Sequence, residues 1–174
     1  NEKSFVLAIS QSGETYDTIS AVKHAKAKGA KTAAIVNVMG SSLSRLVDKV
    51  VLQGSGPEIC VISTKAALSQ MVILIRIGLK LALRKKIINK QGWEKSMGVL
   101  HELPAIIQTI LNERSGFIHR ISHDYFKIKH WLYLGRGVYY PIALESALKM
   151  KEVAYVHAEG MPGGFLKHGT LAMI

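Results

Sequence analysis

An apolar run that breaks into a hydroxyl-rich turn constrains this chain more than any other feature. Residues 5–9 (FVLAI) have the composition of a short buried strand, and residues 18–28 repeat apolar side chains at helical spacing. The turn between them, residues 10–15, carries three hydroxyl side chains, a glutamine and a glycine. Free N–H groups and the positive dipole end of a helix N-terminus attract anions. The turn therefore predicts a phosphate cradle, and an ordinary cap by Ser10 or Ser12 is the alternative.

The first half of the sequence alternates short apolar strands with helices. We expect strands over residues 5–9, 32–37 and 49–52, and helices over 16–28, 43–47 and 63–83. Continuous apolar strands separated by helices are typical of an α/β protein, with a parallel sheet flanked by helices on both faces. Polar, glycine-bearing loops follow the strands at 10–15, 37–42 and 53–58. Ligands bind at that end of such sheets.

The second half predicts a further strand and two helical stretches. Residues 93–127 are helical by pattern, with a kink or a fresh start at Pro104. A strand enters a glycine-bearing turn over 130–137, and a helix over 141–156 precedes a glycine-rich loop over 158–169. The last residues, 171–174, have the composition of the start of a strand. We therefore expect two incomplete α/β domains, over 1–90 and 129–174, joined by connecting helices over 91–128.

Composition and charge exclude several partners. The net charge of +11 comes from Lys and Arg residues scattered through amphipathic helices, without interleaved aromatic residues, so we expect no nucleic-acid partner. Arg76 and Lys80 interrupt the most apolar helix, which predicts a buried core helix and no membrane span. The single cysteine, Cys60, predicts a reduced, cytoplasmic setting.

A helix in the second half brings three charges onto one face. Glu145, Lys149 and Glu152 lie at i, i+4 and i+7, and an exposed, mutually paired face is the ordinary interpretation of that spacing. The following loop bears His157 and His168, which together with the carboxylates indicates an acid–base site. The two histidines lack the spacing of a metal-binding pair, so no metal is expected.

The loop before the long apolar helix carries a second polar cluster. Ser63 is placed to cap that helix. Lys65 in the first helical turn opposes the dipole preference, which hints at a nearby anionic ligand.

Four motifs together resemble the sugar-isomerase half of the glucosamine-6-phosphate synthases, the glutamine:fructose-6-phosphate amidotransferases. They are SQSGET (10–15), NVMGSS (37–42), EICVISTK (58–65) and the combination of LGRG (134–137), PIALESALKMKE (141–152) and LKHG (166–169). The first motif is shared by many sugar-phosphate domains, whereas the last combination is far more specific. The resemblance covers essentially the whole chain and implies sugar-isomerase (SIS) domains with a flavodoxin-like fold, both truncated.

The resemblance also implies roles for individual residues. The residues that would hold the 6-phosphate and line the sugar are Ser10, Gln11, Ser12, Thr15, Val61 and Ser63. Glu152 would move the proton between C1 and C2, with Lys149 as its electrostatic partner and Glu145 fixing the helix face. His168 would assist ring opening from a neighbouring subunit, which implies a homodimer. No cofactor is implied.

The resemblance implies an enzyme that makes glucosamine 6-phosphate from fructose 6-phosphate, with ammonia from a glutaminase domain outside this sequence. The family's C-terminal imine-forming lysine is also absent, so the fragment alone could be inactive. Phe165 stands where the family has a glutamate, which leaves two alternatives open. One is a non-catalytic sugar-phosphate-binding module, and the other is a related deaminase or isomerase without a glutaminase half.

Overall fold

The computed structural model describes residues 1–173, with side chains to residue 172. The chain divides into two compact units, Asn1–Leu103 and Pro104–Ile174. This division falls inside one long helix. The division into residues 1–90, 91–128 and 129–174 that the sequence suggests stays a prediction.

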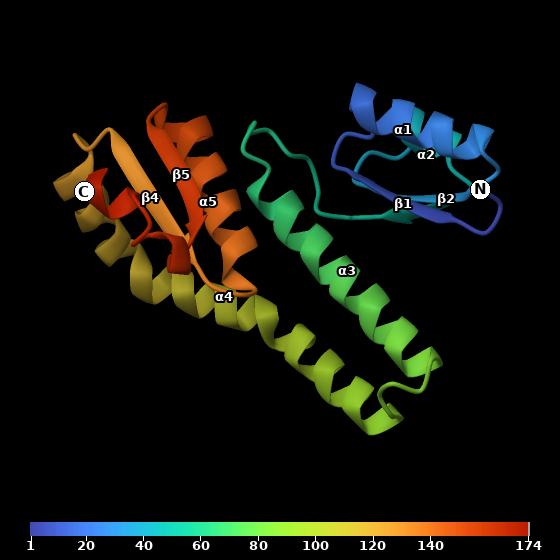
Figure 1. Ribbon diagram of the computed structural model, residues 1–174. Helices are drawn as coiled ribbons and strands as arrows, with labels where there is room; N and C mark the ends of the chain where they lie inside the picture. The colour runs from blue at the N-terminus through green and yellow to red at the C-terminus, as the bar shows by residue number, and fades with distance from the viewer. Residues whose placement is uncertain (174) are drawn as a thin grey trace. The chain divides into compact units, whose positions relative to one another are not determined.

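The first unit is built on a three-stranded parallel sheet. Strands β1 (Phe5–Ser10), β2 (Lys31–Val36) and β3 (Lys49–Leu52) lie in the order β1-β2-β3, and helices α1 (Tyr16–Ala27) and α2 (Ser42–Leu46) connect them (Figure 1). Ser10 pairs with Val36, and Val36 with Leu52, so the carboxyl ends of all three strands are level. The strands and helices predicted over this region are confirmed to within two residues at each end.

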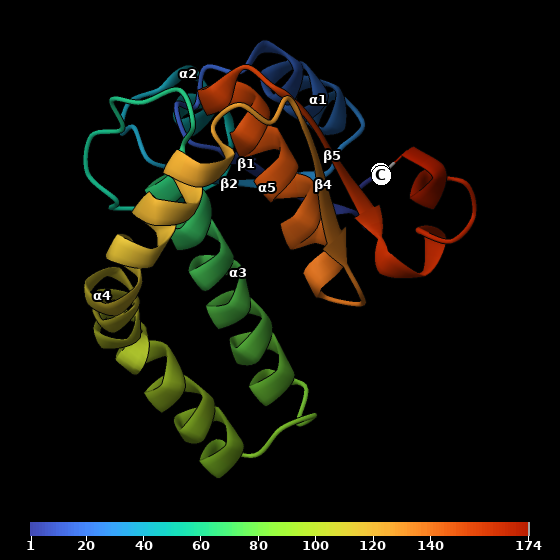
Figure 2. The ribbon, with the colours of Figure 1, turned by 90° about the vertical axis from the view of Figure 1, so that its left-hand side faces the viewer.

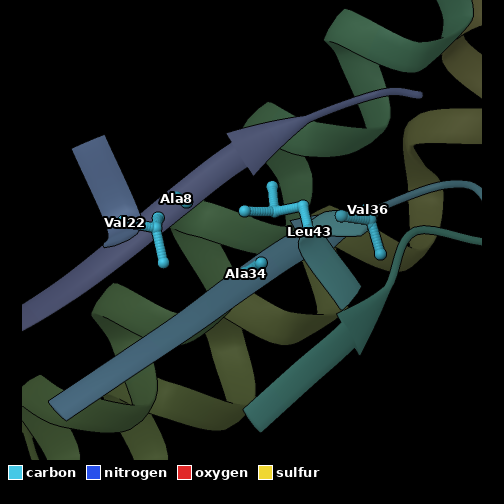
Figure 3. Close-up of a cluster of buried hydrophobic side chains, with 5 residues drawn as sticks. All are labelled: Ala8, Val22, Ala34, Val36 and Leu43. Atoms are coloured by element: carbon cyan, nitrogen blue, oxygen red, sulfur yellow. The ribbon is translucent and has the colours of Figure 1, made fainter. Parts of the chain in front are cut away.

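A small apolar cluster fixes α1 and α2 on one face of this sheet. Figure 3 shows Val22 of α1 and Leu43 of α2 against Ala8 of β1 and against Ala34 and Val36 of β2. Alanine on the strands lets the helices approach closely, and full burial of a Val or Leu side chain stabilises by about 1.5–3 kcal/mol. The cluster therefore fixes where the turn after β1 enters α1.

Helices α3 (Thr64–Arg84) and α4 (Lys90–Tyr125) follow β3. The end of α3 and the start of α4 lie side by side (Figure 2), with the Lys80 ammonium 5.6 Å from the Trp93 ring centre. The expectation of a buried core helix is wrong within the described chain, because Ala66 is the only buried residue of α3 there. Length and apolar composition alone would also let α3 cross a membrane, which is weak evidence since core helices meet the same test.

The helix α4 continues through Pro104. Of the two alternatives predicted at this proline, the fresh start is therefore wrong, and the kink stays a prediction. Proline removes one N–H from the i→i−4 ladder, and a helix of 36 residues keeps its remaining hydrogen bonds on both sides of that gap.

The second unit contains a parallel pair of strands and one covering helix. Strands β4 (His130–Gly135) and β5 (His157–Pro162) pair in parallel, and helix α5 (Tyr139–Ala154) lies between them in sequence. The predicted helix thus begins two residues earlier than expected. The predicted loop over 158–169 is wrong in its first part, which is strand. Two 3-10 turns follow, η1 (Gly163–Phe165) and η2 (Thr170–Met173), so residues 171–173 do not begin a strand, and residue 174 lies outside the described residues.

Close backbone contact with α5 explains one glycine in each of the two strands, Gly135 in β4 and Gly160 in β5. A Cβ at Gly160 would lie 2.7 Å from Leu144 Cα, and one at Gly135 would lie 2.6 Å from Tyr140 Cα. Both contacts join a strand to α5, which runs along one face of β4 and β5 (Figure 1). The glycines therefore permit helix-on-strand packing, and among the described residues α5 covers this one face.

Asp48 ties the start of β3 to the neighbouring elements and predicts a pH-dependent stability. The Thr32 N–H donates to its carboxylate over 2.8 Å, and Lys26 Nζ over 3.0 Å. The Thr32 amide, followed by Lys26 and the Thr32 hydroxyl, lowers the pKa of Asp48 from 3.8 to about 2. Because the folded-state pKa is depressed, the stabilisation is complete above the ordinary value and is lost as pH falls towards 2.

We expect Asp48→Asn to lower the free energy of unfolding at pH 6 and to have almost no effect near pH 2. Urea unfolding of both proteins between these pH values measures the difference. A deficit that stays constant across this range would show that the carboxylate charge of Asp48 is not the source of the stabilisation.

Candidate functional site

The turn after β1 is closed by its own hydroxyl groups. The Gly13 N–H donates to Ser10 Oγ over 3.0 Å, and the Glu14 N–H donates to Ser12 Oγ over 3.1 Å. Ser10 Oγ also lies 3.1 Å from Thr15 Oγ1. The N-cap position of α1 is Thr15, and no side chain caps the helix among the described residues. The alternative of an ordinary serine cap is therefore not what the structure has.

This arrangement leaves the first-turn N–H groups of α1 open to an external acceptor. Ser12 is half-buried, and Thr15 is exposed. The hydroxyl groups of both side chains are able to donate outward while they accept within the turn. A helix N-terminus ringed by hydroxyls suits a phosphate group or another small oxyanion.

The loop after β2 clamps this turn from behind. The Asn37 N–H donates to Gln11 O over 3.0 Å, and the Leu43 N–H donates to Gly13 O over 2.9 Å. A third bond, 2.7 Å long, runs from the Ser42 N–H to Glu14 Oε1. Hydrogen bonding to Ser42 lowers the pKa of the Glu14 carboxyl, so Glu14 is ionised at neutral pH. Gln11 therefore takes part in this contact through its backbone carbonyl group.

Two buried polar residues escaped the sequence analysis. Ser41 is 3% exposed, and its hydroxyl has no hydrogen-bond partner among the described residues. Its side chain lies directly behind Gly13. Gln53, at the end of β3, donates to Ala66 O over 2.9 Å and to Ser69 Oγ over 2.7 Å. Both residues follow the carboxyl end of a strand, and this position in the sequence could have identified them as candidates.

The loop before α3 differs from expectation in two details. Ser63 occupies the N-cap position but has a left-handed backbone (φ +55°) and makes no side-chain cap. Glu58 takes that place, because its Oε2 accepts from the Ala66 N–H over 3.2 Å. Lys65 Nζ donates to Pro57 O over 2.6 Å, so its position does not call for an anionic ligand. The Val61 side chain is exposed.

In the second unit, the three predicted charges of α5 are in contact. Lys149 Nζ lies 2.9 Å from Glu152 Oε2 and 3.2 Å from Glu145 Oε1. Partial burial lowers the pKa of Lys149, but hydrogen bonds and charge from Glu152 and Glu145 outweigh it, and the net pKa is raised. Lys149 thus stays protonated and balances the carboxylates. Of the described residues, Lys149 alone engages Glu152, through Oε2, so Oε1 is free to accept a proton.

His168 lies away from these contacts. It is exposed in the segment between η1 and η2, with its ring centre 6.3 Å from that of Phe165. The backbone N–H of His168 donates to the backbone carbonyl oxygen of Phe165 over 2.9 Å. The structure thus brings together the hydroxyls of the turn after β1 and, separately, the charges of α5. The roles inferred for all of these residues, and for Val61, Ser63 and His168, stay predictions.

Comparison with known protein families identifies one domain type. The SIS domain profile matches residues 1–75 and 124–174. Two relatives named glutamine--fructose-6-phosphate aminotransferase [isomerizing] are similar over the whole chain. The protein from Methanococcus maripaludis is 48% identical, and that from Caldanaerobacter subterraneus subsp. tengcongensis is 43% identical. The chain spans 28% of the length of each.

Solved structures show the same fold. The C-terminal domain of glucosamine-fructose-6-phosphate aminotransferase from Francisella tularensis superposes with a TM-score of 0.93 at 40% identity, over 98% of this chain and 48% of that chain. Glucosamine-6-phosphate deaminase from Thermotoga maritima superposes with a TM-score of 0.67 at 19% identity, over 100% of this chain and 50% of that chain. The second likeness shows the fold alone. The predicted α/β class and the resemblance are confirmed.

Gly13 provides a test of the geometry of the turn. Its φ is +70°, and a Cβ would lie 2.6 Å from Ser41 Cβ. We expect Gly13→Ala to lower the free energy of unfolding by about 1–3 kcal/mol for overpacking, in addition to about 1–2 kcal/mol for the left-handed backbone.

Gly40→Ala is the matched control for Gly13→Ala. Gly40 has a similar φ of +76° with nothing within 4 Å of a Cβ, so only the backbone cost applies. Urea unfolding measures both variants. Equal losses in the two variants would contradict the close contact with Ser41.

Proposed function

This chain belongs to the SIS domain family, and from that membership we propose that it is the sugar-isomerase part of a glutamine–fructose-6-phosphate aminotransferase. It binds fructose 6-phosphate and converts it to glucosamine 6-phosphate with ammonia from a glutaminase domain. The observation that carries the proposal is the similarity of the whole chain to aminotransferases of that name at 43–48% identity. Because the chain spans 28% of their length, the complete reaction belongs to a longer protein.

The turn over residues 10–15 anchors the substrate by its phosphate. Two features support this role, namely the open first turn of α1 and the hydroxyl groups of Ser12 and Thr15 beside it. Gln11 and Ser10 hold the turn in shape through the bonds described above. Residues 10–15 carry no cation, which favours a sugar phosphate over a nucleotide with its metal ion. Val61 and Ser63 line the sugar in this proposal.

Glu152 acts as the base of the isomerisation. Ammonia first replaces the C2 carbonyl oxygen of the sugar, which leaves as water, and forms an imine. Glu152 then removes a proton from C1 and returns it to C2, while the C1 hydroxyl loses its proton and the imine nitrogen gains one. The product is a C1 aldehyde and a C2 amine. The free Oε1 of Glu152 suits this transfer, while Lys149 on Oε2 holds the carboxylate in one orientation. Glu145 forms a second ion pair with Lys149 and so helps to hold the Lys149 ammonium group beside Glu152.

His168 assists opening of the sugar ring. Its side chain is exposed between η1 and η2, where a neighbouring subunit can reach it. From the resemblance to the family, we propose that the protein is a cytoplasmic homodimer. Phe165, which contacts His168 and stands where the family has a glutamate, is the feature that favours the alternative. That alternative is a deaminase or isomerase that uses the same domain without a glutaminase.

Anchoring of the phosphate is tested with Ser12→Ala. We expect fructose 6-phosphate to bind the chain, and the loss of one hydrogen bond to a charged group to weaken binding about 10- to 100-fold. Isothermal titration and ³¹P NMR measure this. Ser20→Ala, an exposed serine further along α1, serves as control and is expected to bind as the wild type does. Equal affinity of the Ser12→Ala and Ser20→Ala variants would remove the anchor from this turn.

The role of Glu152 is tested in the complete protein, with its glutaminase part. Glu152→Gln keeps the shape of the side chain but removes the base, so we expect kcat to fall by about 10²–10⁴ while KM for fructose 6-phosphate changes little. Formation of glucosamine 6-phosphate is the readout, with Glu145→Gln as the milder comparison. An unchanged kcat in Glu152→Gln would place the base elsewhere.

A further inference from the structure

Two histidines that the proposed reaction does not use face one another at the start of the second sheet. His130 is the first residue of β4, His157 is the first residue of β5, and the two are direct partners in the parallel register. Their Nδ1 atoms lie 3.5 Å apart, with the ring centres 5.4 Å apart and the ring planes at 60°. The two rings therefore meet through the same nitrogen.

Both histidines lie on the face of β4 and β5 that α5 leaves uncovered. Side chains alternate between the two faces of a strand, and the missing Cβ of Gly160 points at α5. His157, three residues earlier, therefore points to the opposite face, and contact with His157 places His130 on that face too. Both side chains are exposed, so solvent and ions reach them in the described chain.

The distance between the two Nδ1 atoms is close to the distance between two nitrogen ligands of one metal ion. Two imidazole nitrogens at 2.0–2.1 Å from a tetrahedral zinc ion are about 3.4 Å apart. The observed Nδ1 separation of 3.5 Å matches this value without movement of either strand. A register fixed by the ladder of β4 and β5 presets that distance, which lowers the ordering cost of binding.

We propose that His130 and His157 form a two-histidine site for a divalent late transition metal such as Zn²⁺, Ni²⁺ or Cu²⁺. Neutral imidazole is a preferred ligand of these ions. No cluster of three or more His, Cys, Asp or Glu side chains is present among residues 1–173, so water fills the remaining coordination positions. The site is thus open and binds reversibly. Affinity follows the order Cu²⁺ above Ni²⁺ and Zn²⁺ for a given set of nitrogen ligands.

Two competing arrangements of these histidines lead to different outcomes. In the first, the two rings share only a direct Nδ1···Nδ1 hydrogen bond and no ion binds. In the second, metal binds His119 and His123, which are four residues apart on α4 and so lie on one helix face. No contact joins that second pair among the described residues, whereas the strand pair is already in contact.

The test is titration of the chain with Zn²⁺ and Cu²⁺ by calorimetry, with histidine ring signals followed by NMR for Zn²⁺. We expect one ion per chain, tighter binding of Cu²⁺ than of Zn²⁺, and shifts of the His130 and His157 rings together. Replacing either ligand leaves one imidazole. His157→Asn and His130→Asn are therefore each expected to weaken binding at least tenfold.

Matched variants decide between the pairs. His119→Asn, an exposed histidine on α4, is expected to leave the stoichiometry and affinity unchanged. Circular dichroism of the His157→Asn variant checks that the fold is retained. Absence of binding by the wild type, equal affinity of wild type and His157→Asn, or loss of binding in His119→Asn would each overturn the proposal.

Discussion

Backbone hydrogen bonds between neighbouring loops hold the turn after β1 in place. A parallel sheet brings the ends of β1, β2 and β3 level, so the loop that leaves each strand reaches the loop of the next. Gln11 O accepts from Asn37 N–H, and Gly13 O accepts from Leu43 N–H. These backbone carbonyl groups therefore point to the inner side of the turn, towards the loop after β2. The hydroxyls of Ser12 and Thr15 and the first N–H groups of α1 consequently remain available on the outer side.

The charged cluster on α5 depends on a different balance. A carboxylate that transfers protons must be positioned without being fully neutralised. Lys149 binds one oxygen of Glu152 and shares its charge with Glu145, so two carboxylates compete for one ammonium group. Half-buried side chains strengthen these contacts, since the effective dielectric is lower than in water. The same pattern on a fully exposed helix would be a weak surface pair.

The sequence predicted most of the fold because its signals are local. The strands before residue 53 are short apolar runs, and the spacing of Glu145, Lys149 and Glu152 on a helix determines that they meet. The strand β5 was missed because Gly160, a residue typical of a loop, is required there by contact with α5. That contact joins residues distant in sequence, as does the packing of Ser41 behind Gly13. The apolar composition of α3 led to the prediction that this helix is buried. Burial, however, depends on which other elements pack against a helix, and composition does not contain that information.

The two units repeat one local design with different chemistry. Each has a strand, a glycine-bearing turn and a helix, over residues 5–27 and 130–154. In the first, the turn contains Ser10, Ser12 and Thr15, and Gly13 provides the left-handed backbone. In the second, the turn has no hydroxyl side chain, and Gly135 is required for contact with Tyr140. The first turn is thus suited to an anion and the second to helix packing. The charged side chains of the second unit that contact one another lie along the face of α5, at Glu145, Lys149 and Glu152.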